Sequence, residues 1–451
     1  MSSPSPAAPT GRRSKEPIPP VARRAAVAGS VGTFVEYYDY GLFGVLTVYL
    51  APLFFPTDNP ASSILVSLAV FGLGYAARPI GGLVIGRLGD RRGRRAALLT
   101  SVLLMGVATS LIGVLPTYAS AGITASILLV VLRLVQGFSA GAEVLGSVTY
   151  VLESAPPSRR GFLASLTPLG STLGGATGAL LGGLTSLLVS KATMLDYGWR
   201  IPFLIAIPLS LFAFLFRRKI EDSPEFLELV ARKETAKTPI RDLFRHHRAP
   251  VLLACTLALG LNAVSGIAGW MTTYLAATRQ LPVTPIIFAF GLATLLAAVG
   301  SPITGRLTDR FGGVRVMVVT FVGFLVLSVP IFWVLGTATN IVVLFLVIAL
   351  YLMLIAFVTA PAYAYIAELF STDVRFSGSN LGQNVGVCIA GGTTPLIAGA
   401  LVVGTGSALS PVIWVGAATL VALGTLFVAS RTVKKKAPAR EEEAEVQAQT
   451  A

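Results

Sequence analysis

The chain has 451 residues, of which 54% are hydrophobic and only 12% are charged. This composition is too apolar for a soluble globular protein and is typical of a protein that crosses a membrane several times. The formal net charge is +14, but the basic residues lie in short stretches between apolar runs, which indicates membrane topology and argues against nucleic-acid binding. Cys255 and Cys388 lie inside apolar runs without metal-ligand spacing, so neither a metal nor a cofactor is expected.

The chain begins with a tail, residues 1–20, that is rich in Ser, Pro and Ala and lacks the apolar core of a signal peptide. We expect it to be disordered and cytoplasmic. The first apolar run, about 21–50, carries Glu36 and Asp39 near its middle and on one helix face. A charged side chain at the bilayer centre costs about 2.5–3.5 kcal/mol, and two neighbouring carboxyls in a low dielectric resist being ionised together. Both are therefore candidates for proton coupling.

The second and third runs, about 63–85 and 96–115, are each long enough to cross a bilayer and are joined by GRLGDRRGRR at 86–95. The arginines place this loop on the cytoplasmic side. The candidate gating residues of this region are Arg78, Gly86, Asp90, Arg91, Gly93 and Arg94. Arg78 is expected near the interface, where it extends to the headgroups or pairs with a gate carboxylate. The alternative is a loop that is basic only for topology.

The fourth run, about 121–152, contains Arg133, Gln136 and Glu143. Arg133 stays charged and offers a planar fork to a carboxylate, either of a substrate or of Glu36 or Asp39. The alternative is a permanent structural ion pair between the first and fourth helices. The fifth run, about 161–189, has a glycine every four residues from 170 to 182, which predicts a stripe for close helix packing.

A polar stretch, residues 217–248, follows the sixth run and is too polar to cross a bilayer. We interpret it as a partly helical linker, in which His246 and His247 belong to a solvated basic loop. Six further runs give about twelve spans, which places both termini on one side, and the basic RTVKKK assigns that side to the cytoplasm. The expected domains are a tail (1–20), an N-terminal six-helix bundle (21–216), the linker (217–248), a C-terminal bundle (249–430) and a disordered cytoplasmic tail (431–451).

The second half repeats the pattern of the first. Residues 305–312, GRLTDRFG, reproduce the loop at 86–93, and two carboxylate–arginine pairs at the same spacing bracket equivalent turns. The further gating candidates are Asp309, Arg310, Glu143, Glu153, Arg160, Glu368 and Arg375. The pairs Glu153–Arg160 and Glu368–Arg375 either form salt bridges that close the cytoplasmic side or only set topology.

Polar and aromatic side chains within the spans are candidates to bind a substrate. They are Tyr37, Tyr40, Arg133, Gln136, Asn262, Trp270, Tyr274, Tyr363, Gln383 and Asn384. Each also has a structural interpretation as a packing or lipid-interface residue.

The loop Gly86-x-x-x-Asp90-Arg91-x-Gly93-Arg94-Arg95 and its second copy resemble the signature of the major facilitator superfamily. EYYDYGLFG at 36–44, RLVQGFSAGAE at 133–143 and AELFSTDVRFSG at 367–378 resemble its metabolite:proton symporter family, whose members carry shikimate, citrate, other dicarboxylates, betaine or proline. The resemblance implies an all-α membrane fold of twelve helices in two pseudo-symmetric bundles, alternating access, and proton coupling through acids such as Glu36 and Asp39. Tyr37 stands where this family usually has tryptophan, which leaves the substrate open.

We therefore expect a multi-pass protein of the cytoplasmic membrane that imports a small organic acid or zwitterion together with a proton. It is expected to be a monomer in the lipid bilayer that binds no nucleic acid. The chain lacks HExxH and P-loop motifs, so no enzyme activity is expected. The alternatives are a proton-driven exporter, which uses the same acids, and a transporter-like membrane sensor.

Overall fold

The computed structural model describes residues 17–58, 60–233 and 239–449, and the regular secondary structure of these residues is entirely helical. Twelve long segments follow one another: α1 (Pro20–Phe54), α2 (Pro60–Arg92), α3 (Arg94–Ile112), α5 with α6 (Ile123–Ala140, Val144–Ser154), α7 with α8 (Arg160–Ala164, Leu166–Leu188), α10 (Arg200–Arg218), α13 (Arg248–Thr273), α14 with α15 (Val283–Ala298, Gly300–Phe311), α16 (Gly313–Thr337), α17 (Ile341–Glu368), α18 with α19 (Arg375–Gly386, Gly392–Thr405) and α20 (Pro411–Gln449). The short helices are α4 (Tyr118–Ala121), α9 (Lys191–Thr193), α11 (Pro224–Ala231) and α12 (Pro239–His246).

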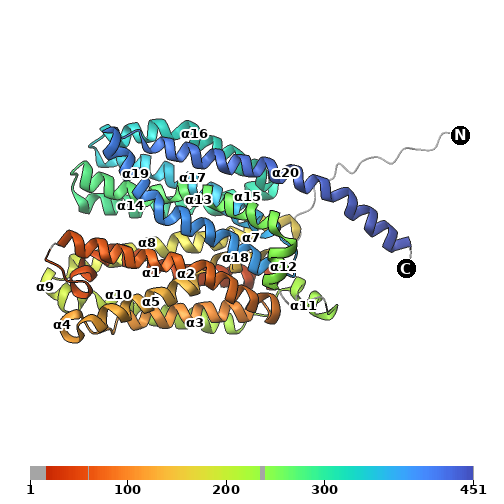
Figure 1. Ribbon diagram of the computed structural model, residues 1–451, viewed down its shortest axis with the longest axis horizontal. Coiled ribbons are helices and arrows are strands. Elements are labelled where there is room, and N and C mark those ends of the chain that lie inside the picture. Colours follow the sequence, from red (N-terminus) through yellow and green to blue (C-terminus); the bar gives the residue numbers. More distant parts are fainter. Residues whose placement is uncertain (1–16, 59, 234–238, 450–451) are drawn as a thin grey trace.

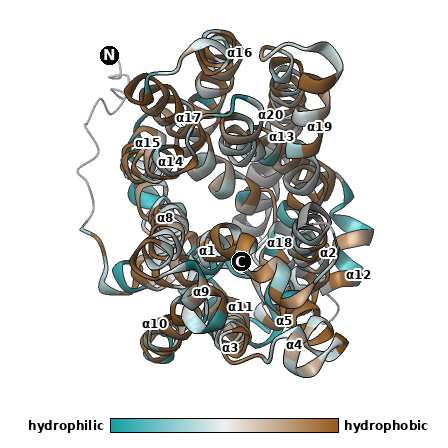
Figure 2. Ribbon diagram, turned by 90° about the vertical axis from the view of Figure 1, so that its left-hand side faces the viewer, coloured by the Kyte–Doolittle hydropathy of each residue, from teal (hydrophilic) through white to brown (hydrophobic). Residues whose placement is uncertain are grey.

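Nine of the segments in the described part of the chain are long and apolar enough to cross a membrane. The other three are α1, α2 and α8. The apolar run of α1 contains Glu36 and Asp39, and α8 is rich in Gly and Thr. The outward-facing helical surfaces are largely hydrophobic (Figure 2), as a lipid environment requires. The protein is an all-α membrane protein.

The segments run side by side, with the first half of the chain in one layer and the second half in another (Figure 1). The linker helices α11 and α12 lie at one end of both layers (Figure 1). We call this end, which also carries Arg94, Arg160 and Arg375, the basic end. Here α2 and α6 of the first half contact α18 of the second, and α7 contacts α15.

The predicted glycine stripe packs against α1. A Cβ at Gly170, Gly174 or Gly178 would collide with the backbone carbonyl oxygen of Ser30, Phe34 or Tyr38, one turn apart along α1. The second half repeats this close helix contact, where Gly382 and Gly386 of α18 meet Ala254 and Ala258 of α13. The stripe therefore brings α1, with its two acids, into backbone contact with α8.

The two repeated loops have the same backbone geometry. Gly93 between α2 and α3 has φ +106°, and Gly312 between α15 and α16 has φ +86°. Side-chain-bearing residues rarely adopt these angles, so glycine is required at both turns. Gly86, earlier in the first loop, faces the backbone of Ser377 in α18, where a Cβ would lie 2.9 Å from the Ser377 Cα.

Two predicted boundaries differ in the structure. The sixth span runs to Arg218 and includes Arg217, which was expected in the linker but is fully buried. The last helix, α20, continues to Gln449, so the described part of the C-terminal tail is helical rather than disordered. Its Ala, Glu, Lys and Gln residues are good helix formers. The expected N-terminal tail lies outside the described residues as far as residue 16.

Candidate functional site

Glu36 and Asp39 lie on the buried face of α1, and each is bound by a different arginine. Arg78 of α2 donates from Nη2 to Glu36 Oε1 at 2.5 Å. Arg133 of α5 donates from Nη1 to Asp39 Oδ2 at 2.7 Å. The exposed fraction of all four side chains is 5% or less. Each carboxylate is therefore neutralised within its own pair, and the repulsion between the two acids is not the dominant interaction at this site.

Arg78 is buried beside Glu36, well before the end of its helix at Arg92, whereas the sequence predicts a position near the end of the span. Its Nε donates to the Tyr40 hydroxyl at 3.3 Å. Its guanidinium carbon lies 4.9 Å from the ring centre of Tyr40 and 5.2 Å from that of Tyr75. The expected pairing of Arg78 with an Asp90-type gate carboxylate is wrong, because the pairing partner is Glu36.

The second pair extends into a hydrogen-bond network within the first half of the chain. Gln136 donates from Nε2 to Asp39 Oδ1 at 2.8 Å and to Thr109 Oγ1 at 2.7 Å. The Arg133 guanidinium lies 3.4 Å from the centre of the Phe43 ring. Of the two alternatives for Arg133, the structure therefore has the ion pair between the first and fourth spans.

A cavity lies between the two halves of the molecule. Its wall from the first half includes Tyr37 and Arg78, and its wall from the second half consists of Tyr363, Asn380, Gln383 and Asn384. Asn384 also donates to the carbonyl oxygen of Gly141 across the two halves, at 2.6 Å. We call this the inter-half cavity. It brings together four of the residues that the sequence offered as substrate ligands, Tyr37, Tyr363, Gln383 and Asn384.

The remaining candidates from the second half do not line this cavity. Trp270 and Tyr274 are buried and stack on each other with ring centres 4.7 Å apart, and Trp270 also stacks on Phe332 at 5.9 Å. Asn262 donates to the Ala258 carbonyl oxygen of its own helix at 2.7 Å. These three residues therefore have packing and helix contacts in the described structure.

The ion pairs at the basic end connect the two halves and the linker. Arg94 donates to both oxygens of Glu153, at 2.8 and 2.9 Å, and to the Thr372 carbonyl oxygen of the second half at 2.7 Å. Arg375 of the second half lies 3.4 Å from Glu153 and 2.6 Å from Glu225 of α11. Glu225 also binds Arg160 at 2.7 Å.

The pairings Glu153–Arg160 and Glu368–Arg375, expected from their equal spacing, are therefore wrong. Glu153 binds Arg94 and Arg375, and Arg160 binds a linker carboxylate. Glu368 is exposed at the end of α17. Equal spacing within one turn does not place the two charged groups together, because the helix ends on either side of the turn pack against the opposite half.

The two signature-loop aspartates make equivalent contacts across the halves. Asp90 accepts from the backbone N–H groups of Phe376 and Ser377, at 3.2 and 2.9 Å, at the start of α18. Asp309 accepts from those of Gly161 and Phe162, at 2.6 and 3.0 Å, at the start of α7. Carboxylates at helix N-termini are favourable because they complement the unsatisfied N–H groups and the helix dipole. These contacts join the two halves at the basic end.

The remaining charged gating candidates lie either on the exposed surface or deeper in the first half of the molecule. Arg91 and Arg310 are exposed, and Arg310 lies 5.0 Å from the ring centre of Phe311. Glu143 is not at the basic surface. It is buried at the break between α5 and α6, where Arg217 and Ser101 bind its carboxylate.

The sequence analysis did not single out four residues that contact the candidate site residues in the structure. Arg217 was assigned to the linker because it starts a charged stretch, and Glu225 was one acid among many in that stretch. Tyr75 and Thr109 carry no pattern that distinguishes them from other span residues. An arginine directly after an apolar run, as at Arg217, is the one available signal that a helix extends beyond its apolar segment.

All buried charged side chains among the described residues belong to the first half of the chain. They are Glu36, Asp39, Arg78, Asp90, Arg94, Arg133, Glu143, Glu153 and Arg217. The buried polar side chains of the second half are uncharged Ser, Thr, Asn and Gln. The two walls of the inter-half cavity therefore differ in charge.

Comparisons with known proteins agree with this architecture. A family model described as Major Facilitator Superfamily matches residues 29–383. The ectoine/proline transporter ProP of Corynebacterium glutamicum is 35% identical over 428 residues, which cover 88% of this chain and 82% of that protein. A citrate-proton symporter of Klebsiella pneumoniae is 32% identical over 408 residues, which cover 87% of this chain and 88% of that protein.

Solved structures of similar fold include the proton:xylose symporter XylE bound to 6-bromo-6-deoxy-D-glucose. It matches with a TM-score of 0.74 at 16% identity and covers 90% of this chain and 95% of that one. A partially occluded inward-open conformation of XylE from E. coli matches with a TM-score of 0.67 at 15% identity, covering 90% of this chain and 99% of that one.

Proposed function

The chain belongs to the major facilitator superfamily, and from this premise we propose that it is a proton-coupled symporter that imports a small carboxylate-bearing zwitterion. The observation that carries the proposal is the Glu36–Arg78 pair at the wall of the inter-half cavity. Such a pair offers one arginine to two competing partners, the carboxylate of Glu36 and the carboxylate of a substrate.

The coupling step follows from that competition. When Glu36 takes up a proton, it loses its negative charge and its ion pair with Arg78. Arg78 then faces the cavity as an uncompensated cation, which a substrate carboxylate neutralises. A proton alone leaves the Arg78 cation without a partner, and a substrate carboxylate alone leaves the Glu36 carboxylate without one. Both states are unfavourable, since a buried unpaired charge is costly. Binding of each therefore favours binding of the other, as symport requires.

The substrate class follows from the charges around the cavity. Arg78 is the charged side chain among the described residues lining it, and the wall from the second half is uncharged. One carboxylate therefore has a partner, whereas the additional carboxylates of a dianion or trianion do not. Tyr37 and Tyr363 offer ring faces to a cationic group, and Gln383 and Asn384 offer amide groups to polar substituents. The name of the ectoine/proline transporter relative supports this class.

We propose that the basic end faces the cytoplasm, so that both termini are cytoplasmic and the protein lies in the cytoplasmic membrane as a monomer. The excess of arginine in the loops at this end supports that orientation. In this orientation the contacts of Asp90, Asp309 and Glu153 close the cytoplasmic side. Alternating access then requires these contacts to break when the substrate is released inward.

Uptake into proteoliposomes tests the proposal. The panel contains radiolabelled proline, ectoine, glycine betaine, shikimate and citrate, with an inward pH gradient and with the gradient collapsed. Gradient-dependent accumulation of a zwitterion, but not of citrate, is the expected result. Accumulation of citrate alone would contradict the substrate class. Efflux driven by an opposite gradient, without uptake of any compound, would support the exporter alternative.

Two variants complete the test. Arg78→Gln should bind none of these substrates, because it removes the carboxylate partner. Glu228→Gln is the matched control, since Glu228 is an exposed carboxylate of the linker helix α11, and it should transport like the unaltered protein.

A further inference from the structure

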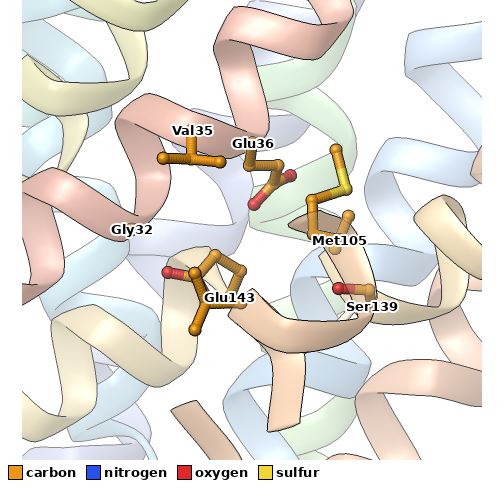
Figure 3. Close-up of a pocket in the computed structure, with 8 residues that line it drawn as sticks. Gly32, Val35, Glu36, Met105, Ser139 and Glu143 are labelled. Carbon is orange, nitrogen blue, oxygen red and sulfur yellow. The ribbon is translucent and has the colours of Figure 1, made fainter. Parts of the chain in front are cut away.

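A second cavity lies beside Glu36, between α1, α3 and the break in the fourth span. Its lining residues are Gly32, Val35, Glu36, Val102, Met105, Ser139, Ala140 and Glu143 (Figure 3). Ala140 also lines the inter-half cavity, so the two cavities adjoin. Like the inter-half cavity, this second cavity has room for about one water molecule in this structure. We call it the acid cavity because it contains two carboxylates.

The two oxygens of Glu36 have different surroundings. Oε1 accepts the hydrogen bond of Arg78, whereas the buried Oε2 accepts none from the described residues. The Glu36 carboxyl points into the space between α1 and the turn that carries Glu143 (Figure 3). A buried oxygen without a partner is unfavourable. A water in the acid cavity would satisfy it and would link Glu36 to Glu143.

Glu143 is held in place on the other side of the cavity. Ser101 of α3 donates to its Oε2 at 2.5 Å, and Ser147 of α6 donates to its Oε1 at 3.2 Å. Arg217 of α10 donates from Nη1 at 2.9 Å and from Nη2 to the other oxygen. The charged groups that face Glu143 are thus Arg217 and, across the cavity, Glu36. Gly32 makes room for the pair, since a Cβ there would collide with both Arg217 and Glu143.

We propose that Glu143 is a second proton-binding carboxylate, which exchanges a proton with Glu36 through one water in the acid cavity. In this step the O–H bond of protonated Glu36 breaks and the water takes up that proton, while the water gives another proton to the Glu143 carboxylate. The ion pair of Arg217 is lost, but its guanidinium keeps the carbonyl oxygens of Ala28 and Leu98 as acceptors. This inference rests on the proposed role of Glu36 as the proton carrier.

Protons and substrate then leave by different routes. Gly32 precedes Glu36 by one turn, and α1 begins at the basic end, so the Glu143–Arg217 pair lies nearer to that end than Glu36 does. A proton on Glu143 therefore moves toward the basic end within the first half of the molecule. The substrate remains in the inter-half cavity on the other side of Arg78.

Two assays with the same proteoliposomes separate a proton relay from a structural role. The first measures accumulation of radiolabelled proline and ectoine under an inward gradient of about one pH unit, which allows about ten-fold accumulation for one proton per substrate. The second measures counterflow exchange of the same compounds without a gradient, which needs no net proton movement. Glu143→Gln should keep counterflow but reduce the accumulation ratio to about one. Equal loss of both activities, or unchanged accumulation, would overturn the proposal.

A second variant decides the question if Glu143→Gln does not fold. Val102→Ile adds one methylene group to the wall of the acid cavity and leaves both carboxylates and Arg217 intact. It should slow gradient-driven accumulation and leave counterflow unchanged. The matched control is Val107→Ile on the same helix, because Val107 is 49% exposed on the outer surface. Unchanged accumulation by Val102→Ile would contradict the relay. Absence of gradient-driven uptake by the unaltered protein would instead refute the proposed function itself.

Discussion

Arg78 shows how the role of one residue depends on the length of its helix. The sequence placed it near the interface because the apolar run around it ends at about residue 85. In the structure α2 continues to Arg92, so Arg78 lies about 20 Å from the basic end of its helix. Beyond its apolar run the helix packs against the second half, where Gly86 and Gly89 meet Ser377 and Phe376, a contact that no local pattern reveals.

Glu36→Gln should uncouple transport from the proton. Glutamine cannot release a proton, so Arg78 remains permanently available to the substrate carboxylate. We expect counterflow of proline or ectoine to persist, while accumulation under a pH gradient falls to the level without a gradient. Parallel pH electrodes should record no substrate-induced proton uptake. Retained accumulation in this variant would exclude Glu36 as the coupling residue.

Asp39→Ala should destabilise the protein strongly, because it leaves the Arg133 guanidinium buried without its carboxylate. Removing one partner of a buried ion pair costs about 3–5 kcal/mol. The double variant Asp39→Ala/Arg133→Met removes both charges and should recover most of the thermal stability measured in detergent. Equal destabilisation in the single and double variants would show that the ion pair itself is not the cause.

At the scale of the helices, the sequence predicted the helical elements well but predicted poorly which charged residues of different helices pair with each other. The glycine stripe of α8, the repeated loops at Gly93 and Gly312 and the polar linker all follow from local pattern and spacing. The partners of Glu153 and Arg78 do not, because they are set by how helices distant in the chain pack. The acids on α1 were correctly assigned to one helix face, but two different helices supply their arginines.

Gly174→Ala should separate α1 from α8. The added Cβ would collide with the Phe34 carbonyl oxygen, and overpacking of this kind costs about 1–3 kcal/mol. We expect a lower melting temperature and reduced transport. Gly183→Ala on the same helix is the control, since a Cβ there meets nothing within 4 Å. A similar drop in melting temperature and transport in both variants would indicate an effect of helix propensity and not of the α1–α8 contact.

At the scale of the whole molecule, the ion-pair network at the basic end connects the two halves and the linker. Glu153 is its centre, since it binds Arg94 of its own half, Arg375 of the other half and Ser223 beside the linker helix. Loss of this carboxylate weakens all three connections at once. The open state does not require these contacts, so its population should rise.

Glu153→Gln should therefore expose residues between the halves at the basic end. Thr149 lies there, 3.4 Å from Ser379 of the second half. In a background without Cys255 and Cys388, a cysteine substituted for Thr149 should react faster with a membrane-impermeant thiol reagent in inverted vesicles when Glu153 is replaced. Glu228→Gln serves as the control. An unchanged reaction rate would show that Glu153 does not hold this end closed.

The confinement of buried charge to the first half has a consequence for how such a protein diversifies. In the proposed mechanism, the residues that couple transport to the proton gradient lie in the first half, and the second half contributes neutral side chains to the inter-half cavity. Substitutions in the neutral bundle can therefore change the transported compound without disturbing the energy source. A chimera that joins this first half to the second half of a relative with another solute should inherit its selectivity from the relative and its proton dependence from this chain.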